Sequence, residues 1–325
     1  MIYLAPVAAL VLALAYLMLC SRPEPMGAYD QPTGRRFAVD DETKAAYRAF
    51  ANALAEGGVA LAKLPASERI VRLRQGLDGL GEAVEFEETL TPFAEGGVEG
   101  EWVLPKSGPP RGRILFVHGG FYTMGSPLSH RALTTRLARE SGAAVFALRY
   151  SLLPEHARKQ LLADVRRAWI WLAAAAPGEK LALMGDSAGG NLALAAARLA
   201  SQAPSVARPA AVVALSPAVD TTMTAPSFKE NRASDLTVGP ALAPVLKLPA
   251  ALWRLIELAQ FRVWPNDPEI SPCSATSPAC PRPFSRPAPR KCWSATACVM
   301  STRRARKGPK RAYSFGMACR MSGCS

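Results

Sequence analysis

Short apolar runs alternate with longer stretches of helical spacing through the middle of the chain. The apolar runs predict strands at Val84–Leu90, Gly97–Leu104, Ile114–Val117, Ala144–Arg149, Leu181–Met184 and Ala211–Leu215. Helical spacing of apolar residues predicts helices at Ser129–Ser141, Leu161–Ala175 and Ala188–Ala200. Strands that alternate with amphipathic helices are typical of a mostly parallel sheet covered on both faces. We therefore expect an α/β fold with a doubly wound sheet.

The chain of 325 residues is 49% apolar, which allows one large core with an appendage. An Ala-rich stretch, Asp41–Glu56, predicts a helix before the sheet, and we expect Gly57 and Gly58 to stop it. We divide the chain into an N-terminal anchor (1–21), a linker with N-terminal or cap helices (22–82), an α/β core (83–272) and a C-terminal tail (273–325).

The anchor prediction rests on Ile2–Cys20, an uncharged and mostly apolar run of nineteen residues. This is the length that a helix needs to cross a bilayer, so we interpret the run as a single membrane-spanning helix. A cleaved signal peptide with secretion is one alternative, although basic residues before the run and a clear cleavage site after it are missing. A buried helix is another. Arg22, Arg35 and Arg36 follow the run and favour a cytoplasmic domain, but the side of the membrane stays open.

The composition changes abruptly at Pro272. The formal net charge is +13, but the tail alone contains eleven Lys and Arg and no Asp or Glu, so the preceding residues carry a net charge of only +2. Six of the seven cysteines also lie in the tail. A strongly basic chain would ordinarily indicate an anionic partner such as nucleic acid. Because the charge is confined to the tail, we expect no nucleic-acid partner for the core.

A G-x-S-x-G motif lies between a predicted strand and a predicted helix, at Gly185-Asp186-Ser187-Ala188-Gly189. In this setting a sharp turn exposes the serine hydroxyl, and the two glycines leave room for the turn. The N–H of Ala188 then lies at a helix N-terminus, where it can stabilise an oxyanion. The alternative is a tight turn that contains an incidental serine. We predict Ser187 to be a nucleophile.

A second motif, His118-Gly119-Gly120-Phe121, follows an earlier predicted strand. Consecutive glycines let the backbone turn N–H groups toward a substrate oxygen, so Gly119 and Gly120 are predicted oxyanion donors together with Ala188. We interpret His118 as a structural residue that fixes this loop by hydrogen bonds, since an oxyanion loop needs orientation and not another base. Phe121 and Tyr122 are candidate contacts in the substrate pocket.

With both motifs, the chain resembles the hormone-sensitive-lipase-like branch of the α/β-hydrolases, a group of bacterial esterases and lipases with an HGG oxyanion motif. The matching segments, in chain order, are His118–Gly120, Gly125-Ser126, Arg149–His156, Gly185–Asn191, Leu215–Pro217 and Asn266–Pro272. The resemblance covers roughly Gly97 to Pro272. It implies an α/β-hydrolase fold and a serine ester hydrolase that acts on small-molecule or lipid esters without a metal or cofactor.

The resemblance has further implications for single segments. Glu155 and His156 would belong to a structural turn, and Ala241–Val263 would supply a cap helix over the acyl pocket. The family often has Gly or another small residue where this chain has Phe121, and this difference bears on the third oxyanion donor and on the shape of the pocket.

The partners of the nucleophile are missing from the sequence. A serine of this kind needs a histidine base oriented by a carboxylate, in the chain order Ser, Asp or Glu, His. This chain has no histidine after His156 and no carboxylate after Glu269. His118, His130 and His156 all precede Ser187, so none occupies the family's position, and we do not expect a rearranged triad.

We hypothesise that the tail is translated out of frame. If the third base of each codon is paired with the first two of the next, the residues after Pro272 permit Leu-Phe-Gly-Asp-Leu-x-Gly-Leu-Pro-Pro, which is how the family continues. Gly316 to Gly323 then permit His-Gly-Met-Pro-His-Val-Trp, similar to the sequence around the family's catalytic histidine. Here TCN serine and CGN arginine codons are assumed. The gene's nucleotide sequence decides this hypothesis.

Two other interpretations of the tail stay open. Arg303–Lys307 with Lys310 and Arg311 could form a basic arm for nucleic acid or anionic lipid. The six cysteines could form a disulfide or metal framework, although they lack C-x2-C pairs and an accompanying histidine. For the chain as a whole, the expected function is ester hydrolysis that is impaired here, and the alternative is a non-catalytic pseudo-hydrolase that binds a ligand.

Overall fold

The computed structural model describes residues 40–82, 85–221, 235–242, 247–248, 250–265, 267, 269–271, 302–304 and 313–315. The predicted membrane anchor and nearly all of the tail lie outside these residues. Among the described residues, no helix is both long enough and apolar enough to span a bilayer. The described part falls into two compact units, one with residues 40–218, 302–304 and 313–315 and the other with the residues between 219 and 271.

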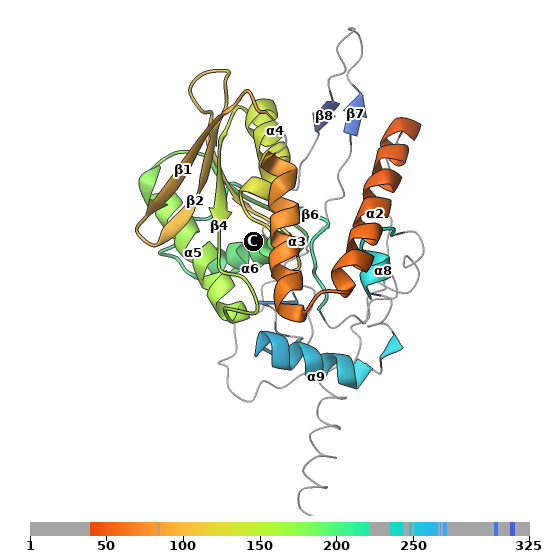
Figure 1. Ribbon diagram of the computed structural model, residues 1–325. Helices are drawn as coiled ribbons and strands as arrows, with labels where there is room; N and C mark the ends of the chain where they lie inside the picture. The colour runs from red at the N-terminus through yellow and green to blue at the C-terminus, as the bar shows by residue number, and fades with distance from the viewer. Residues whose placement is uncertain are drawn as a thin grey trace, which may run out of the picture. The chain divides into compact units, whose positions relative to one another are not determined.

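The larger unit contains a six-stranded sheet in the order β1-β2-β4-β3-β5-β6 (Figure 1). Its strands are β1 (Thr89–Glu95), β2 (Val98–Leu104), β3 (Arg113–Val117), β4 (Ala144–Arg149), β5 (Leu181–Asp186) and β6 (Ala211–Leu215). The pairs β3–β4, β3–β5 and β5–β6 are parallel, whereas β1–β2 and β2–β4 are antiparallel. The predicted mostly parallel α/β sheet is confirmed.

Helices cover both faces of this sheet. Adjacent residues of a strand point to opposite faces. On β4, Val145 packs in a core cluster with Ala138 of α4, whereas the next residue, Phe146, contacts the ring of Trp171 on α5. Therefore α4 (Arg131–Ser141) and α5 (Arg158–Ala175) lie on opposite faces. The helix α6 (Ser187–Gln202) packs against α5, β5 and β6.

The first predicted strand was wrong in position. We expected a strand at Val84–Leu90, but β1 begins at Thr89 and continues to Glu95. The hairpin turn sets this register: Gly96 and Gly97 have φ of 60° and 72°, and Glu95 pairs with Val98. A two-residue turn with both residues in the left-handed region is the form that best joins antiparallel strands.

The N-terminal helices also differ from the prediction. The helix α2 runs from Asp41 to Ala62 and passes through Gly57 and Gly58, which were expected to stop it. A glycine inside a helix costs only about 1 kcal/mol relative to alanine, so two glycines weaken α2 without ending it. The Asp40 side chain caps α2 by accepting a hydrogen bond from the Thr43 N–H at 2.8 Å. A further helix, α3 (Ala66–Glu82), lies in the region where N-terminal or cap helices were expected, but the sequence pattern did not predict its bounds.

The smaller unit contains α8 (Val238–Leu242) and α9 (Ala250–Phe261). The helix α9 lies within Ala241–Val263, the stretch expected to supply a cap helix. Ile270 and Ser271, from one of the family-like segments, are buried, and Ser271 Oγ accepts a hydrogen bond from the Thr221 N–H at 2.9 Å. In the tail, β7 (Thr302–Arg304) pairs antiparallel with β8 (Tyr313–Phe315).

Candidate active site

The predicted nucleophile lies in a tight turn between β5 and α6. Strand β5 ends at Asp186, and α6 begins at Ser187, whose φ is +48°. A non-glycine residue rarely adopts this conformation, and it persists only where the surrounding structure enforces it. The Ser187 side chain is partly exposed, and the Ser187 carbonyl accepts a hydrogen bond from the Ala218 N–H at 3.1 Å.

Close backbone packing explains the two glycines of the motif. A Cβ on Gly189 would lie 2.0 Å from the Val117 carbonyl oxygen and 2.3 Å from that of His118. A Cβ on Gly185 would lie 2.5 Å from the Gly189 carbonyl oxygen. Real Cβ atoms do not approach oxygen this closely, so both positions require glycine. The sharp turn predicted from the G-x-S-x-G pattern is present.

The HGG loop, residues 118–127, follows β3, which is the parallel neighbour of β5. Val117 of β3 pairs with Gly185 of β5. The two motifs therefore emerge side by side at the carboxyl edge of the sheet. Gly120 has a φ of +118°, and a Cβ there would lie 2.1 Å from the Met124 carbonyl oxygen. This position also accepts only glycine.

The backbone N–H of Gly119 requires a correction. It donates a hydrogen bond to Asp186 Oδ1 at 2.9 Å, so it is already occupied and does not serve as the predicted oxyanion donor. Gly119 instead connects the HGG loop to the turn that holds Ser187. Asp186 fits closely here, because a Cβ on Gly119 would lie 2.3 Å from its Oδ2.

The two candidate pocket residues differ sharply in exposure. Phe121 and Tyr122 have φ of 54° and 63°, an uncommon conformation for aromatic residues. The Phe121 side chain is 48% exposed, whereas Tyr122 is buried and its ring lies 4.5 Å from the guanidinium carbon of Arg158. Of these two rings, only that of Phe121 is open to solvent.

His118 is buried, and its contacts suit the structural role that the sequence suggested. Its Nδ1 lies 2.8 Å from the Gly119 carbonyl oxygen and must donate to it, and its ring stacks on Tyr150 with centroids 4.3 Å apart. The Tyr150 hydroxyl donates to the His118 carbonyl at 2.7 Å. Burial, followed by the nearby His130, lowers the pKa of His118 to about 3. The ring is therefore neutral at physiological pH. Burial likewise raises the pKa of Tyr150.

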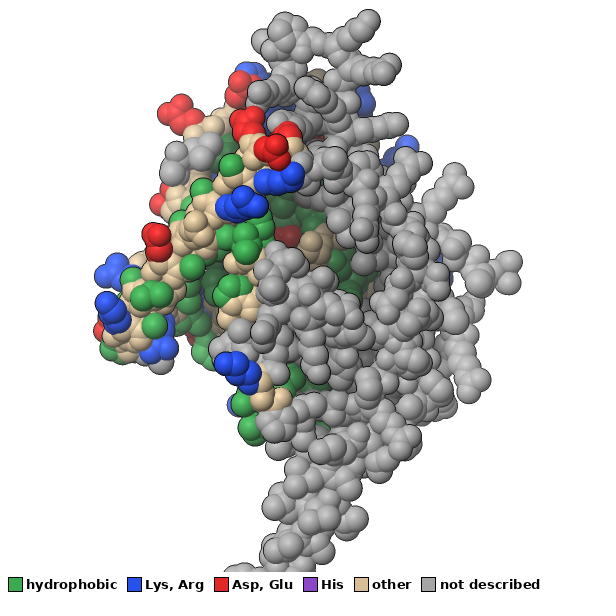
Figure 2. Space-filling view, turned by 90° about the vertical axis from the view of Figure 1, so that its right-hand side faces the viewer, with side chains coloured by type: hydrophobic (Ala, Val, Ile, Leu, Met, Phe, Trp, Pro, Cys, Tyr) green, Lys and Arg blue, Asp and Glu red, His purple; other side chains and the backbone are tan. Residues whose placement is uncertain are grey.

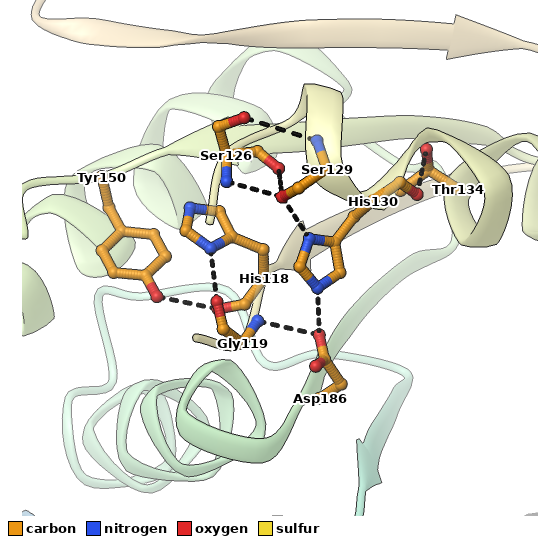
Figure 3. Close-up of polar contacts among 8 residues, drawn as sticks. All are labelled: His118, Gly119, Ser126, Ser129, His130, Thr134, Tyr150 and Asp186. Atoms are coloured by element: carbon orange, nitrogen blue, oxygen red, sulfur yellow. Dashed lines mark hydrogen bonds and ion pairs between the residues drawn. The ribbon is translucent and has the colours of Figure 1, made fainter. Parts of the chain in front are cut away.

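A polar chain runs from the HGG loop to the start of α4 (Figure 3). His130 Nε2 lies 3.3 Å from Asp186 Oδ1, and His130 Nδ1 lies 2.9 Å from Ser129 Oγ. Ser129 in turn accepts from the Ser126 N–H at 2.9 Å. Asp186 thus has two partners, His130 and Gly119, from two separate segments. The sequence held no spacing signal for the His130–Asp186 pair.

The three histidines, all of which are described, do not hydrogen-bond Ser187. His118 and His130 have the partners given above, and His156 is exposed in the turn before α5. The described part of the chain therefore offers Ser187 no histidine base. Within those same residues, no cluster of His, Cys, Asp and Glu has the make-up of a metal site.

A cavity of about 610 Å³ lies at the opposite edge of the sheet. It is lined by residues at the amino ends of β3, β4 and β5, among them Arg113, Ala144 and Lys180, and by Trp102. Because Ser187 follows the carboxyl end of β5, this cavity is not the candidate active site.

Comparison with known proteins gives consistent matches. A family model described as the alpha/beta hydrolase fold matches residues 114–284, about half of the chain. An acetyl-hydrolase from Streptomyces hygroscopicus is 37% identical over 142 residues, which are 43% of this chain and 47% of that protein. An esterase from Acinetobacter venetianus is 31% identical over 186 residues, 56% of this chain and 57% of that protein. The chain spans about half the length of these curated relatives.

Solved structures show the same likeness over more of the chain. A hormone-sensitive lipase from a metagenome library superposes with a TM-score of 0.57 at 29% identity, covering 74% of this chain and 75% of that one. An esterase from the bacterial hormone-sensitive lipase family superposes with a TM-score of 0.55 at 28% identity, covering 68% and 72%.

Proposed function

The chain belongs to the α/β-hydrolase fold family, in its hormone-sensitive-lipase-like branch, and on this premise we propose that it is built as a carboxylic-ester hydrolase with Ser187 as nucleophile. The observation that carries the proposal is the turn at Ser187, where a strained serine begins α6 between two glycines that admit no side chain. The esterase and hydrolase names of the relatives support the reaction class.

In the proposed reaction, Ser187 Oγ attacks the ester carbonyl carbon while a general base accepts the hydroxyl proton. The tetrahedral intermediate carries its negative charge on the former carbonyl oxygen. As this intermediate collapses, the alcohol leaves with the proton, and an acyl group remains on Ser187. Water then attacks the acyl-enzyme by the same route and releases the acid.

Backbone N–H groups would stabilise the oxyanion. Since the Gly119 N–H is donated to Asp186, we propose Gly120, Phe121 and Ala188 as the donors. Among the described residues, neither Gly120 nor Phe121 donates its N–H to another protein group. Each donor of this kind is worth a factor of about 10² to 10³ in rate. Phe121 would serve in two ways, through its N–H and through its exposed ring beside the bound ester.

The missing base decides how active this chain can be. Without a histidine after Ser187, only substrate binding and the oxyanion donors remain, so we expect the chain as written to be nearly inactive. We propose that the tail is read out of frame. In the shifted frame, the Arg320/Met321 junction permits His and the Ala295/Thr296 junction permits Asp. These would restore the order Ser, Asp, His. Because the family match continues to residue 284, the nucleotide sequence must locate the frame change.

The experiment compares three purified proteins in their hydrolysis of p-nitrophenyl acetate. They are the chain as written, a frame-restored version whose tail is translated in the shifted frame, and the frame-restored version with Ser187→Ala. We expect turnover only in the frame-restored protein with Ser187 intact. Activity in neither form of the chain would favour the second candidate function, a pseudo-hydrolase that binds an ester without cleaving it. That candidate is favoured by the absence of a histidine that bonds Ser187 in the described residues.

For its location, we propose that Ile2–Cys20 anchors the chain in a membrane, which would place the hydrolase near lipid esters. Retention of the full chain in the membrane pellet after an alkaline carbonate wash, with release of a version that starts at residue 22, is the expected result. Release of both versions would remove the proposal, and secretion of a shortened chain would indicate a signal peptide.

A further inference from the structure

One face of α3 contacts the part of the chain that follows the two glycines of the HGG motif. Arg74, Asp78 and Gly81 are spaced by four and three residues, so they lie on the same side of the helix. Arg74 and Asp78 contact the HGG loop, and Gly81 contacts Leu128, which follows the loop directly. The space-filling view shows charged and hydrophobic side chains mixed over the visible described surface (Figure 2).

Arg74 makes the most extensive of these contacts. Its Nε donates to the Thr123 carbonyl at 2.8 Å, and its Nη2 donates to the Leu153 carbonyl at 3.0 Å. Both terminal nitrogens also bond the Glu155 carboxylate at 2.8 Å, and this pairing lowers the pKa of Glu155. One guanidinium therefore connects α3, the HGG loop and the turn before α5. The Leu153 N–H adds a direct link by donating to the Tyr122 carbonyl at 2.8 Å.

Asp78 and Gly81 continue this contact one and two turns further along α3. The Asp78 carboxylate accepts a hydrogen bond from Ser126 Oγ. Ser126 begins the polar chain that passes through Ser129 and His130 to Asp186. At Gly81, a Cβ would lie 1.7 Å from the Leu128 carbonyl oxygen, so only glycine allows α3 to approach this closely.

The HGG loop needs such support because its conformation is costly. Phe121 and Tyr122 both have positive φ, a conformation that persists only where the surrounding structure stabilises it. Thr123, which follows them directly, is the residue whose carbonyl Arg74 holds. A hydrogen bond from a charged donor is stronger than one between neutral groups, so it can offset the cost of a strained residue.

We propose that Arg74 is a positioning residue for the HGG loop. Its hydrogen bond to the Thr123 carbonyl keeps the N–H groups of Gly120 and Phe121 directed at the reacting oxygen. Arg74 acts through the backbone and does not itself contact the substrate. The catalytic consequence rests on the proposed ester hydrolysis, whereas the effect on the loop does not.

The first test measures amide hydrogen exchange in the full-length chain with its sequence as written. The amides of Gly119, Thr123, Met124 and Ser126 are hydrogen-bonded and report on the loop. In Arg74→Gln we expect their exchange to accelerate by on the order of tenfold. The control is Arg113→Gln, because Arg113 forms a similar two-bond ion pair with Glu179 and is equally exposed, at 27% against 26% for Arg74. Equal exchange in the two variants would overturn the proposal.

A second variant separates the ion pair from the carbonyl contact. Glu155→Gln removes the charge partner of Arg74 but leaves Arg74 free to bond the Thr123 and Leu153 carbonyls. We expect the loop amides to stay protected in Glu155→Gln. If they exchange as fast as in Arg74→Gln, the ion pair and not the bond to Thr123 holds the loop, and the proposal is wrong.

The third test uses the frame-restored protein on p-nitrophenyl acetate. We expect Arg74→Gln to lower kcat by on the order of tenfold with little change in KM, since oxyanion donors act mainly in the transition state. Arg113→Gln should leave both parameters unchanged. An unchanged kcat in Arg74→Gln would contradict the proposal. If the frame-restored parent itself has no activity, the proposed function fails, and the exchange measurements still decide whether Arg74 positions the loop.

Discussion

Gly119 donates its backbone N–H to the side chain of Asp186 at 2.9 Å, and this hydrogen bond joins the HGG loop to the turn that carries Ser187. The residue between Gly185 and Ser187 in the motif is therefore more than a spacer. His130 holds the same carboxylate oxygen from the start of α4. Two segments that would supply the nucleophile and the oxyanion donors are thus fixed to each other through one side chain.

The first prediction concerns this carboxylate. Asp186→Ala leaves the Gly119 N–H without its acceptor, which should cost about 1–3 kcal/mol of the free energy of unfolding. Urea denaturation measures this loss. As a control, Glu99→Ala removes an exposed ion pair with Arg149 and should change the free energy by less than about 1 kcal/mol. A loss in Asp186→Ala no larger than in the control would mean that the bond contributes little.

Two glycine substitutions should change the stability of the protein in opposite directions. Gly189→Ala places a Cβ 2.0 Å from the Val117 carbonyl oxygen and should destabilise the protein by about 3 kcal/mol or more. Gly57→Ala adds a methyl group in open space on α2 and should stabilise it by about 0.5–1 kcal/mol. Thermal melting of both variants checks the pair, and a tolerated Gly189→Ala would refute the close packing described for the turn.

The buried His118 predicts a dependence of stability on pH. Its pKa is about 3 in the folded protein, below the unfolded value of 6.5, so the unfolded chain binds more protons between these pH values. Stability from this group is therefore fully present above pH 6.5 and declines as the pH falls toward 3. Between pH 7 and pH 5 the loss should be about 2 kcal/mol. Urea unfolding at both pH values measures it.

His118→Gln serves as the control for this pH effect. The variant lacks the titrating ring, so its own loss of stability between pH 7 and pH 5 should be smaller by about 2 kcal/mol. Its overall stability can be lower at both pH values without affecting this comparison. An identical pH dependence in the two proteins would indicate that another group is responsible.

The parts of the fold that the sequence predicted well are those with long apolar runs. Ala144–Arg149 and Ala211–Leu215 were predicted with the bounds that β4 and β6 have. Strand β4 is buried except at Arg149 and β6 is at least partly buried throughout, so the apolar character of both is visible in the sequence. The errors occurred where a turn or a tertiary contact decides the outcome. The turn at Gly96 and Gly97 sets the position of β1, and one face of α3 contacts a loop that lies far along the chain.

Part of the candidate site could also be predicted from the sequence. The two motifs indicated Ser187, Gly120 and Ala188, because glycine patterns report tight turns directly. The role of Gly119 was not predictable, since it depends on a hydrogen bond to a residue on another strand. The same holds for His130 and Arg74, whose partners lie far away in the sequence. Pairwise contacts of this kind leave no periodic signal.

We propose Ser187 as the nucleophile of a serine ester hydrolase whose base is missing from this chain. Mass spectrometry of proteins treated with a fluorophosphonate, which labels activated serines, tests it most directly. We predict one adduct on the peptide that contains Ser187 in the frame-restored protein, and little or no adduct in the chain as written or in the frame-restored Ser187→Ala variant. Rapid labelling of another serine, or no labelling of the frame-restored protein, would contradict the account.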